Sequence, residues 1–246
     1  MSIYSKLSAL LTAANTKTGE SDTTLTDAVQ TLIDGYGQGG GGTDYLVANI
    51  DGSLTSYESD EVTAIRSEAF RGMRSLASFK CHNVTDFLGY NNGSWSTTAG
   101  NAAYCFYATA LVSLAFPKIN DIKTQSINSV GTTFLALDLG PTCGRIDNQG
   151  IAGNSNFNTL ILRKSDGITA AGNSNILNNT KFASGGAGGT IYIPKALYDH
   201  LGDGTSLDYK AATNWSTING YGTITWAQIE GSQYETHYAD GTVIPT

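Results

Sequence analysis

The sequence predicts a mostly β protein with short helices, in which an α-helical hairpin precedes a solenoid, a stack of similar repeats. Three observations predict this fold. Apolar residues recur at a fixed interval along the middle of the chain. The composition favours many tight turns between short strands, and residues 1–36 carry a helical pattern of apolar residues. A fixed interval of apolar residues is typical of repeats that stack to bury one continuous core.

The composition limits the class of protein and its partners. Of the 246 residues only 14% are charged, whereas an ordinary soluble domain has about 25%. The chain contains 29 glycines and 10% aromatic residues, a combination suited to short strands separated by turns. Its net charge of −7 repels phosphate backbones, so we expect no nucleic-acid partner. No apolar run reaches the roughly 18 residues that span a bilayer, so we expect no membrane insertion.

Residues 1–36 are predicted to form the α-helical hairpin. Two groups of apolar residues recur there at the spacing of one helix face, and a polar turn separates them. The Thr-x-x-Asp signal at 24–27 would cap the second helix, and Gly35 would end it. Because two short helices bury little surface alone, we expect this anchor to dock on a partner or to self-associate. The predicted assembly residues are Ile3, Leu7, Leu10, Leu11, Val29, Leu32 and Ile33.

A glycine-rich linker, residues 37–43, separates the anchor from the rest of the chain. After it, two strand-like segments, 45–50 and 54–57, flank Asp51-Gly52. An Asp-Gly pair between two such segments is typical of a β-hairpin, so the sequence predicts a hairpin here.

The repeat itself lies within residues 44–220. One motif, an apolar residue three positions before a leucine, starts at Leu111, Phe134 and Phe157, which are 23 residues apart. A related copy starts at Leu76, 35 residues before Leu111, which indicates an insertion at 88–101. A period in the twenties predicts a leucine-rich-repeat-like solenoid, with one short strand and a turn in each unit.

Residues 68–79, Glu-Ala-Phe-Arg-Gly-Met-Arg-Ser-Leu-Ala-Ser-Phe, followed by Asn-Val-Thr at 83–85, resemble the BspA-type leucine-rich repeat. A second copy begins at Ala103-Tyr-Cys-Phe, and later copies keep only the apolar positions. The resemblance covers residues 45–218 and implies a solenoid closed by caps. The remaining segment, 221–246, is predicted to be a C-terminal β tail with a turn at Asp240-Gly241.

The segment 10–37 is similar to a leader found on structural proteins of phages and prophages of Gram-positive bacteria. This resemblance implies a virion protein of the tail or a fibre, made in the host cytoplasm without a signal peptide. Its implied partners are other virion proteins, further copies of itself (a trimer is one candidate) and a host cell-surface glycan or protein. Two alternatives stay open: a purely structural capsid or tail assembly protein, and a bacterial surface adhesion or protein-interaction module.

The insertion supplies the candidate ligand-binding residues, Tyr90 and Trp95, which lie among Asn, Gly and Ser. Exposed aromatic rings in a polar loop are suited to stacking on sugars. The alternative is that Trp95 packs back onto the solenoid as core.

No catalytic or metal-binding pattern stands out. His82, His200 and His237 are far apart and lack the neighbouring ligands of a zinc site. Cys105 occupies a repeat position suited to a buried, inert thiol. The chain lacks a Gly-x-Ser-x-Gly motif, so we expect no enzymatic activity, no metal and no cofactor. An enzyme such as a cell-wall hydrolase would require clustered carboxylates or a Cys/His pair.

Overall fold

The structure is a computed structural model. It describes residues 45–46, 54–91, 94–96, 102–170, 176–182, 187–210 and 224–245. The predicted helical hairpin and the glycine-rich linker lie outside these residues. Its regular secondary structure consists mainly of short strands, with a short helix α3 (Lys195–Tyr198) and a 3-10 helix η1 (Gln233–Glu235). The prediction of a mostly β chain is therefore confirmed for these residues.

The strands of the repeated motif, β7 (Ser113–Phe116), β9 (Ala136–Leu139) and β11 (Thr159–Leu162), form one parallel sheet with two later strands. Leu114 pairs with Leu137, and Leu137 pairs with Leu160, so the register reproduces the 23-residue interval of the sequence. A parallel pair, β2 (Ser56–Glu58) and β4 (Ser78–Lys80), lies beside the sheet, with β4 in contact with β7. The five strands, from one edge to the other, are β14 (Ile224–Gln228), β13 (Gly189–Ile193), β11 (Thr159–Leu162), β9 (Ala136–Leu139) and β7 (Ser113–Phe116).

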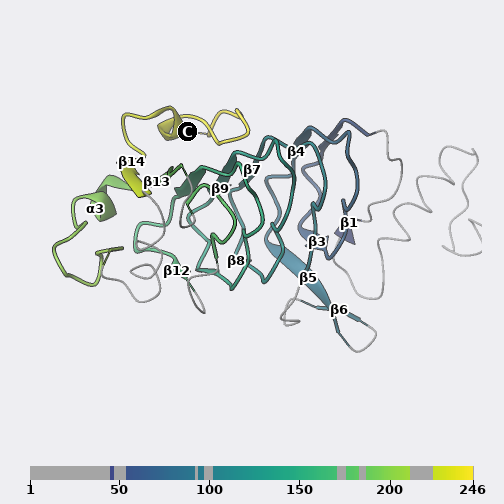
Figure 1. Ribbon diagram of the computed structural model, residues 1–246, viewed down its shortest axis with the longest axis horizontal. Coiled ribbons are helices and arrows are strands. Elements are labelled where there is room, and N and C mark those ends of the chain that lie inside the picture. Colours follow the sequence, from purple (N-terminus) through teal and green to yellow (C-terminus); the bar gives the residue numbers. More distant parts are fainter. Residues whose placement is uncertain are drawn as a thin grey trace, which may run out of the picture.

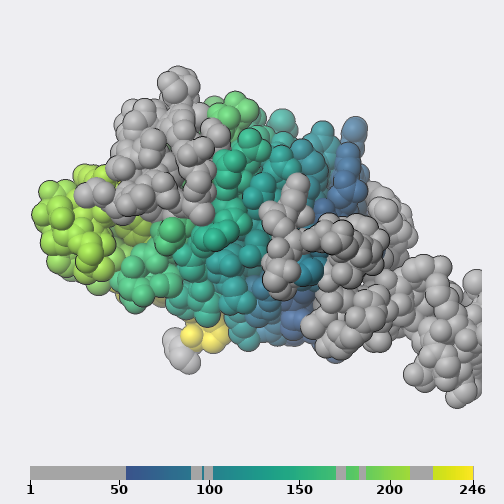
Figure 2. Space-filling model, turned by 90° about the horizontal axis from the view of Figure 1, so that it is seen from below, coloured from purple at the N-terminus to yellow at the C-terminus, as the bar shows by residue number. Residues whose placement is uncertain are grey.

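A second row of short parallel strands lies across the core from this sheet (Figure 1). Within the row, β3 lies between β1 and β5, and β10 lies between β8 and β12. The chain passes from one row to the other and back in each turn up to β13, so the sequence colours form successive bands along the molecule (Figure 2). The row comprises β1 (Tyr45–Leu46), β3 (Ala64–Arg66), β5 (Asp86–Asn91), β8 (Asp121–Ile122), β10 (Arg145–Ile146) and β12 (Thr169–Ala170).

The core is a ladder of like side chains. Leu114, Leu137 and Leu160 are fully buried at equivalent positions of successive strands. Aromatic rings stack in the same way: the ring centroids of Phe134 and Phe157 are 5.5 Å apart and the two ring planes are nearly parallel. Because each turn places the same residue type over the previous one, apolar surface is buried along the whole stack.

On the third side of the stack the two rows are connected by irregular segments and not by strands. The backbone of each such segment is hydrogen-bonded to the equivalent segment of the next repeat. The backbone N–H of Phe70 donates to Cys105 O at 2.7 Å, and that of Tyr104 donates to Gln125 O at 2.9 Å. Left-handed backbone conformations let the chain turn sharply here, although they are unfavourable for residues with a side chain. All seven described non-glycine residues with positive φ lie on this side: Glu68, Tyr104, Ala108, Gln125, Ser129, Gln149 and Asn179.

The predicted hairpin around Asp51-Gly52 is wrong. Strand β1 pairs in parallel with β3, and β2 pairs in parallel with β4. The two segments belong to different rows of the same turn, so each pairs with its equivalent in the next turn. The local preference of the Asp-Gly pair is overridden by the stacking of whole turns.

Gly140, which follows β9, shows how closely the turns approach one another. A Cβ atom at this position would lie 1.8 Å from Pro117 O in the preceding turn. Nothing but glycine fits there without moving the backbone. At Gly144, four residues later, the nearest atom to such a Cβ is 3.7 Å away, which is an ordinary contact.

We therefore expect Gly140→Ala to lower the free energy of unfolding by about 2–3 kcal/mol, because the added methyl group forces two turns apart. Urea denaturation measures this change. The matched variant Gly144→Ala should leave stability within about 0.5 kcal/mol, or raise it slightly. Equal effects of the two substitutions would contradict the close approach at Gly140.

Candidate functional site

The outer face of the five-stranded sheet is the surface that the repeats build together. Along each strand the side chains alternate, so the residue before each inward-facing residue (Leu114, Leu137, Leu160, Ile191 or Trp226) points outward. These outward positions share one register from β7 to β14, with Ala136 between Ser113 and Thr159. Four of the five carry a hydroxyl group, and we call them the hydroxyl row: Ser113, Thr159, Thr190 and Thr225.

Apolar side chains and an amide border this row at the start of the strands. Val112 is 47% exposed and Leu135 is 40% exposed, and the Leu135 N–H donates to Val112 O at 2.8 Å. Asn158 follows on the next strand, and its Oδ1 accepts a hydrogen bond from Thr159 Oγ1 at 2.9 Å. We call this surface the open strip: the hydroxyl row together with Val112, Leu135 and Asn158.

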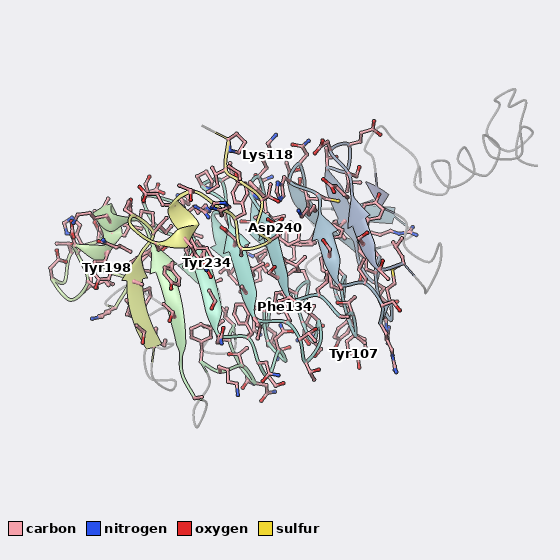
Figure 3. The ribbon with its side chains drawn as sticks, turned by 90° about the horizontal axis from the view of Figure 1, so that it is seen from above. Tyr107, Lys118, Phe134, Tyr198, Tyr234 and Asp240 are labelled. Carbon is pink, nitrogen blue, oxygen red and sulfur yellow. The ribbon has the colours of Figure 1, made fainter. Side chains whose placement is uncertain are left out.

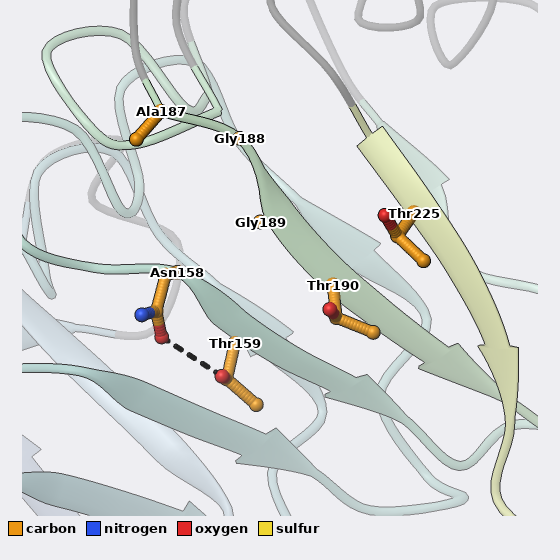
Figure 4. Close-up of a pocket in the computed structure, with 7 residues that line it drawn as sticks. All are labelled: Asn158, Thr159, Ala187, Gly188, Gly189, Thr190 and Thr225. Atoms are coloured by element: carbon orange, nitrogen blue, oxygen red, sulfur yellow. Dashed lines mark hydrogen bonds between the residues drawn. The ribbon is translucent and has the colours of Figure 1, made fainter.

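One end of the open strip is hollowed (Figure 4). The hollow has a volume of about 270 Å³ and is open to solvent on one side. Gly188 and Gly189 in its lining carry no side chain, so the backbone itself forms part of the wall. Its lining is uncharged and consists of Asn158, Thr159, Ala187, Gly188, Gly189, Thr190 and Thr225.

The C-terminal segment, residues 229–245, lies across the other half of the same face, at the carboxyl ends of the strands (Figure 3). Its central attachment is Arg163, which binds both carboxylate oxygens of Asp138 at 2.7 Å. The same guanidinium donates to Tyr234 O at 2.8 Å, and the N–H of Ala239 donates to Asp138 Oδ2 at 3.0 Å. One ion pair of the sheet thus holds the tail at two points.

This ion pair is covered by the tail. Asp138 points outward from β9 yet is only 1% exposed, and Ala115 and Ile161 on the neighbouring strands are buried at the same level of the sheet. Burial raises the pKa of the Asp138 carboxyl, and the hydrogen bonds from Arg163 and Ala239 act in the opposite direction. A carboxylate in such a position depends on its hydrogen-bonding partners.

A second contact holds the far end of the tail. His82 Nε2 lies 2.7 Å from Asp240 Oδ2, and the His82 ring makes an edge contact with Tyr238. Burial opposes ionisation of Asp240, but the hydrogen bonds from His82 and from the Thr242 N–H outweigh it and lower the pKa of this carboxyl. The predicted turn at Asp240-Gly241 is present, with the Tyr238 N–H donating to Thr242 O at 2.8 Å.

The predicted binding residues Tyr90 and Trp95 lie on a hairpin that interrupts the stack. Strand β6 (Ser94–Ser96) pairs antiparallel with the end of β5, which places Tyr90 opposite Trp95. In Figure 1 this hairpin extends away from the body of the stack. The side chains of both residues lie outside what the structure describes, and so do all the predicted assembly residues from Ile3 to Ile33.

The histidines and cysteines do not come together in one site. His82 pairs with Asp240, His200 Nδ1 lies 2.6 Å from Asp203 Oδ2, and His237 contacts Thr236. All three thiols, of Cys81, Cys105 and Cys143, are free and buried, as predicted for Cys105. Burial raises the pKa of Cys81 and of Cys143 to about 12, so these groups stay protonated and are poor nucleophiles.

The residues that the structure describes contain no group of three or more His, Cys, Asp or Glu side chains arranged to hold a metal ion. Within the same residues, every helix is too short or too polar to cross a membrane.

Comparison with family models, curated proteins and solved structures finds no match to this chain. The chemistry of the sheet face is therefore the basis for a functional argument. The open strip presents hydroxyl and amide groups, which both donate and accept hydrogen bonds, beside two exposed aliphatic side chains. Such a surface can bind a polar ligand without a formal charge.

Sequence reasoning missed both the open strip and the tail contacts. A signal for the strip exists within the 23-residue motif, because its third position is Ser113, Ala136 or Thr159, small or hydroxylated each time. The ion pair had no such signal, since Arg163 and Asp138 are 25 residues apart and belong to different repeats.

Removing the guanidinium should loosen the tail. We expect Arg163→Ala to cost about 3–5 kcal/mol of stability, because Asp138 is left buried without its partner. Urea denaturation measures the loss, and amide hydrogen exchange should be faster at residues 234–239. Lys195→Ala is the control: both partners of its ion pair with Asp199 are exposed, so the pair should contribute less than about 1 kcal/mol. Unchanged exchange in the Arg163 variant would show that the ion pair does not hold the tail.

Proposed function

We propose that this chain is a phage virion structural protein, a component of the tail or a fibre, whose repeat region is exposed for attachment to the host surface. The observation that carries the proposal is a stack of parallel turns that leaves half of one sheet face open. Repeat stacks of this kind offer extended binding surfaces, because every turn adds one strand to the same face.

In this proposal the repeat region is a leucine-rich-repeat-like solenoid. The equal register steps between β7, β9 and β11 support it, as does the continuous core of leucines and phenylalanines. A solenoid must also protect its ends. Helix α3, with Leu197 buried, lies against the last strand β14 and suits such a cap.

The segment 1–36 supplies the second half of the proposal. Its resemblance to leaders of phage and prophage structural proteins, and its two apolar helix faces, support a role in attachment to the particle. Its partners would be other virion proteins and further copies of this chain. The repeat region would then contact a glycan or protein of the host cell surface.

The location is tested by immunogold electron microscopy of phage particles released from a culture that carries this gene. We expect antibodies against the full chain to label the tail or a fibre and to block adsorption to host cells. Labelling without a block of adsorption would favour the purely structural assembly role. Unlabelled particles, with the protein on the bacterial surface instead, would favour the adhesion module and contradict the proposal.

The assembly role of segment 1–36 is tested by light scattering on the full chain. We expect a discrete oligomer, and we expect the double variant Leu10→Asp, Leu32→Asp to be a folded monomer, because charges on both apolar helix faces prevent their burial. The matched variant Ser8→Asp, Thr31→Asp places the same charges on neighbouring polar positions and should remain oligomeric. A monomeric parent chain would contradict an anchor that self-associates.

A further inference from the structure

We propose that the open strip binds an extended, uncharged polysaccharide chain that lies across the strands. This inference rests on the proposed attachment function and names the ligand class of the sheet face. It also moves the predicted binding site from the Tyr90–Trp95 hairpin to the hydroxyl row.

The first argument is charge. Every side chain of the open strip is uncharged, and so is the lining of the hollow at its end. The ion pair on the same face, Asp138 with Arg163, is neutralised within the protein and covered by the tail. An acidic polymer would need exposed Arg or Lys partners and would be repelled by the net charge of −7. The strip therefore suits a ligand without charge.

The second argument is hydrogen bonding. The hydroxyls of Ser113, Thr190 and Thr225 can each donate one hydrogen bond and accept others, as sugar hydroxyls do. Asn158 accepts from Thr159 through Oδ1, so its two amide hydrogens can be directed to a ligand. Flexible donor–acceptor groups of this kind can follow the varied hydroxyl orientations of a saccharide.

The third argument is spacing. Neighbouring strands lie about 4.8 Å apart, so Thr159, Thr190 and Thr225 repeat their hydroxyls at that interval. An extended chain of hexose units advances by a similar length per unit, which lets successive sugars meet successive strands. Val112 and Leu135 lie at the side of the row, where they can contact the apolar C–H faces of the rings.

A protein receptor or a second copy of this chain fits the strip less well. Stable protein interfaces bury about 800 Å² on each partner around an apolar, often aromatic, centre. The open strip exposes two aliphatic side chains and otherwise hydroxyl and amide groups. Its hollow of about 270 Å³ is sized for a small group, such as one sugar unit or a branch of the chain.

The test is affinity electrophoresis of the full chain in native gels that contain one polysaccharide each. Hydroxyethyl cellulose, mannan, dextran and soluble starch are the uncharged probes, and hyaluronan and alginate are the acidic ones. We expect retardation by at least one uncharged probe and none by the acidic probes. Retardation by the acidic probes alone, or by no probe, would overturn the proposal.

Variants locate the site. The double variant Thr159→Val, Thr190→Val keeps the β-branched shape and removes two hydroxyls. We therefore expect its affinity for the polysaccharide to fall by about tenfold or more. Thr169→Val is the matched control, because Thr169 is an exposed strand residue of the second row, and it should bind like the parent chain. Equal binding by the double variant and the parent would overturn the assignment to the open strip. Thermal unfolding of each variant shows that the fold is intact.

A parallel readout separates this inference from the proposed function. Polysaccharide binding that depends on Thr159 and Thr190, in a protein absent from phage particles, would leave the site standing and remove the virion role. The converse result is that antibodies label the particles, but particles with the double variant adsorb to host cells as well as particles with the parent chain. That result would support the virion role and contradict the polysaccharide site.

Discussion

The structure depends on one constraint: each turn of the chain runs parallel to the turn before it and is hydrogen-bonded to it. Strands β7, β9 and β11 pair at 23-residue steps, and the turns of the third side also donate hydrogen bonds to their neighbours. Many backbone N–H and C=O groups are thus hydrogen-bonded from one turn to the next. The same spacing brings like side chains together, which produces the leucine ladder, the stacked phenylalanines and the close approach at Gly140.

This constraint explains what could be read from the sequence. Burial in a ladder demands an apolar residue at each step, so Leu114, Leu137 and Leu160 record the period directly. The prediction of a hairpin at Asp51-Gly52 was wrong because the turn preference of an Asp-Gly pair does not indicate that the strands before and after it belong to different rows. The tail contacts were out of reach for another reason. His82 and Asp240 are 158 residues apart, and no periodic pattern connects a repeat to a segment outside it.

The two halves of the sheet face have opposite character, and the same register creates both. The positions before each buried leucine carry small or hydroxylated residues, which keep the strip flat and polar. Two residues further along the strands, Ala115, Asp138 and Ile161 form a mixed row that would expose both a charge and apolar surface in isolation. Covering this row with the tail removes apolar surface from water and leaves the uncharged strip as the accessible part.

A repetitive face poses a problem for any segment that covers it, because each strand offers nearly the same surface as the next. A tail held by apolar contacts alone could shift by one strand at little cost. The Arg163–Asp138 pair breaks this equivalence, since the charges occur on two adjacent turns and must meet Tyr234 O and the Ala239 N–H together. A shift by one strand would leave the Arg163–Asp138 pair intact but would break its hydrogen bonds with Tyr234 O and the Ala239 N–H, at a cost of about 1.5–3 kcal/mol for each bond. The buried ion pair thus fixes the position of the tail, and through it the boundary of the open strip.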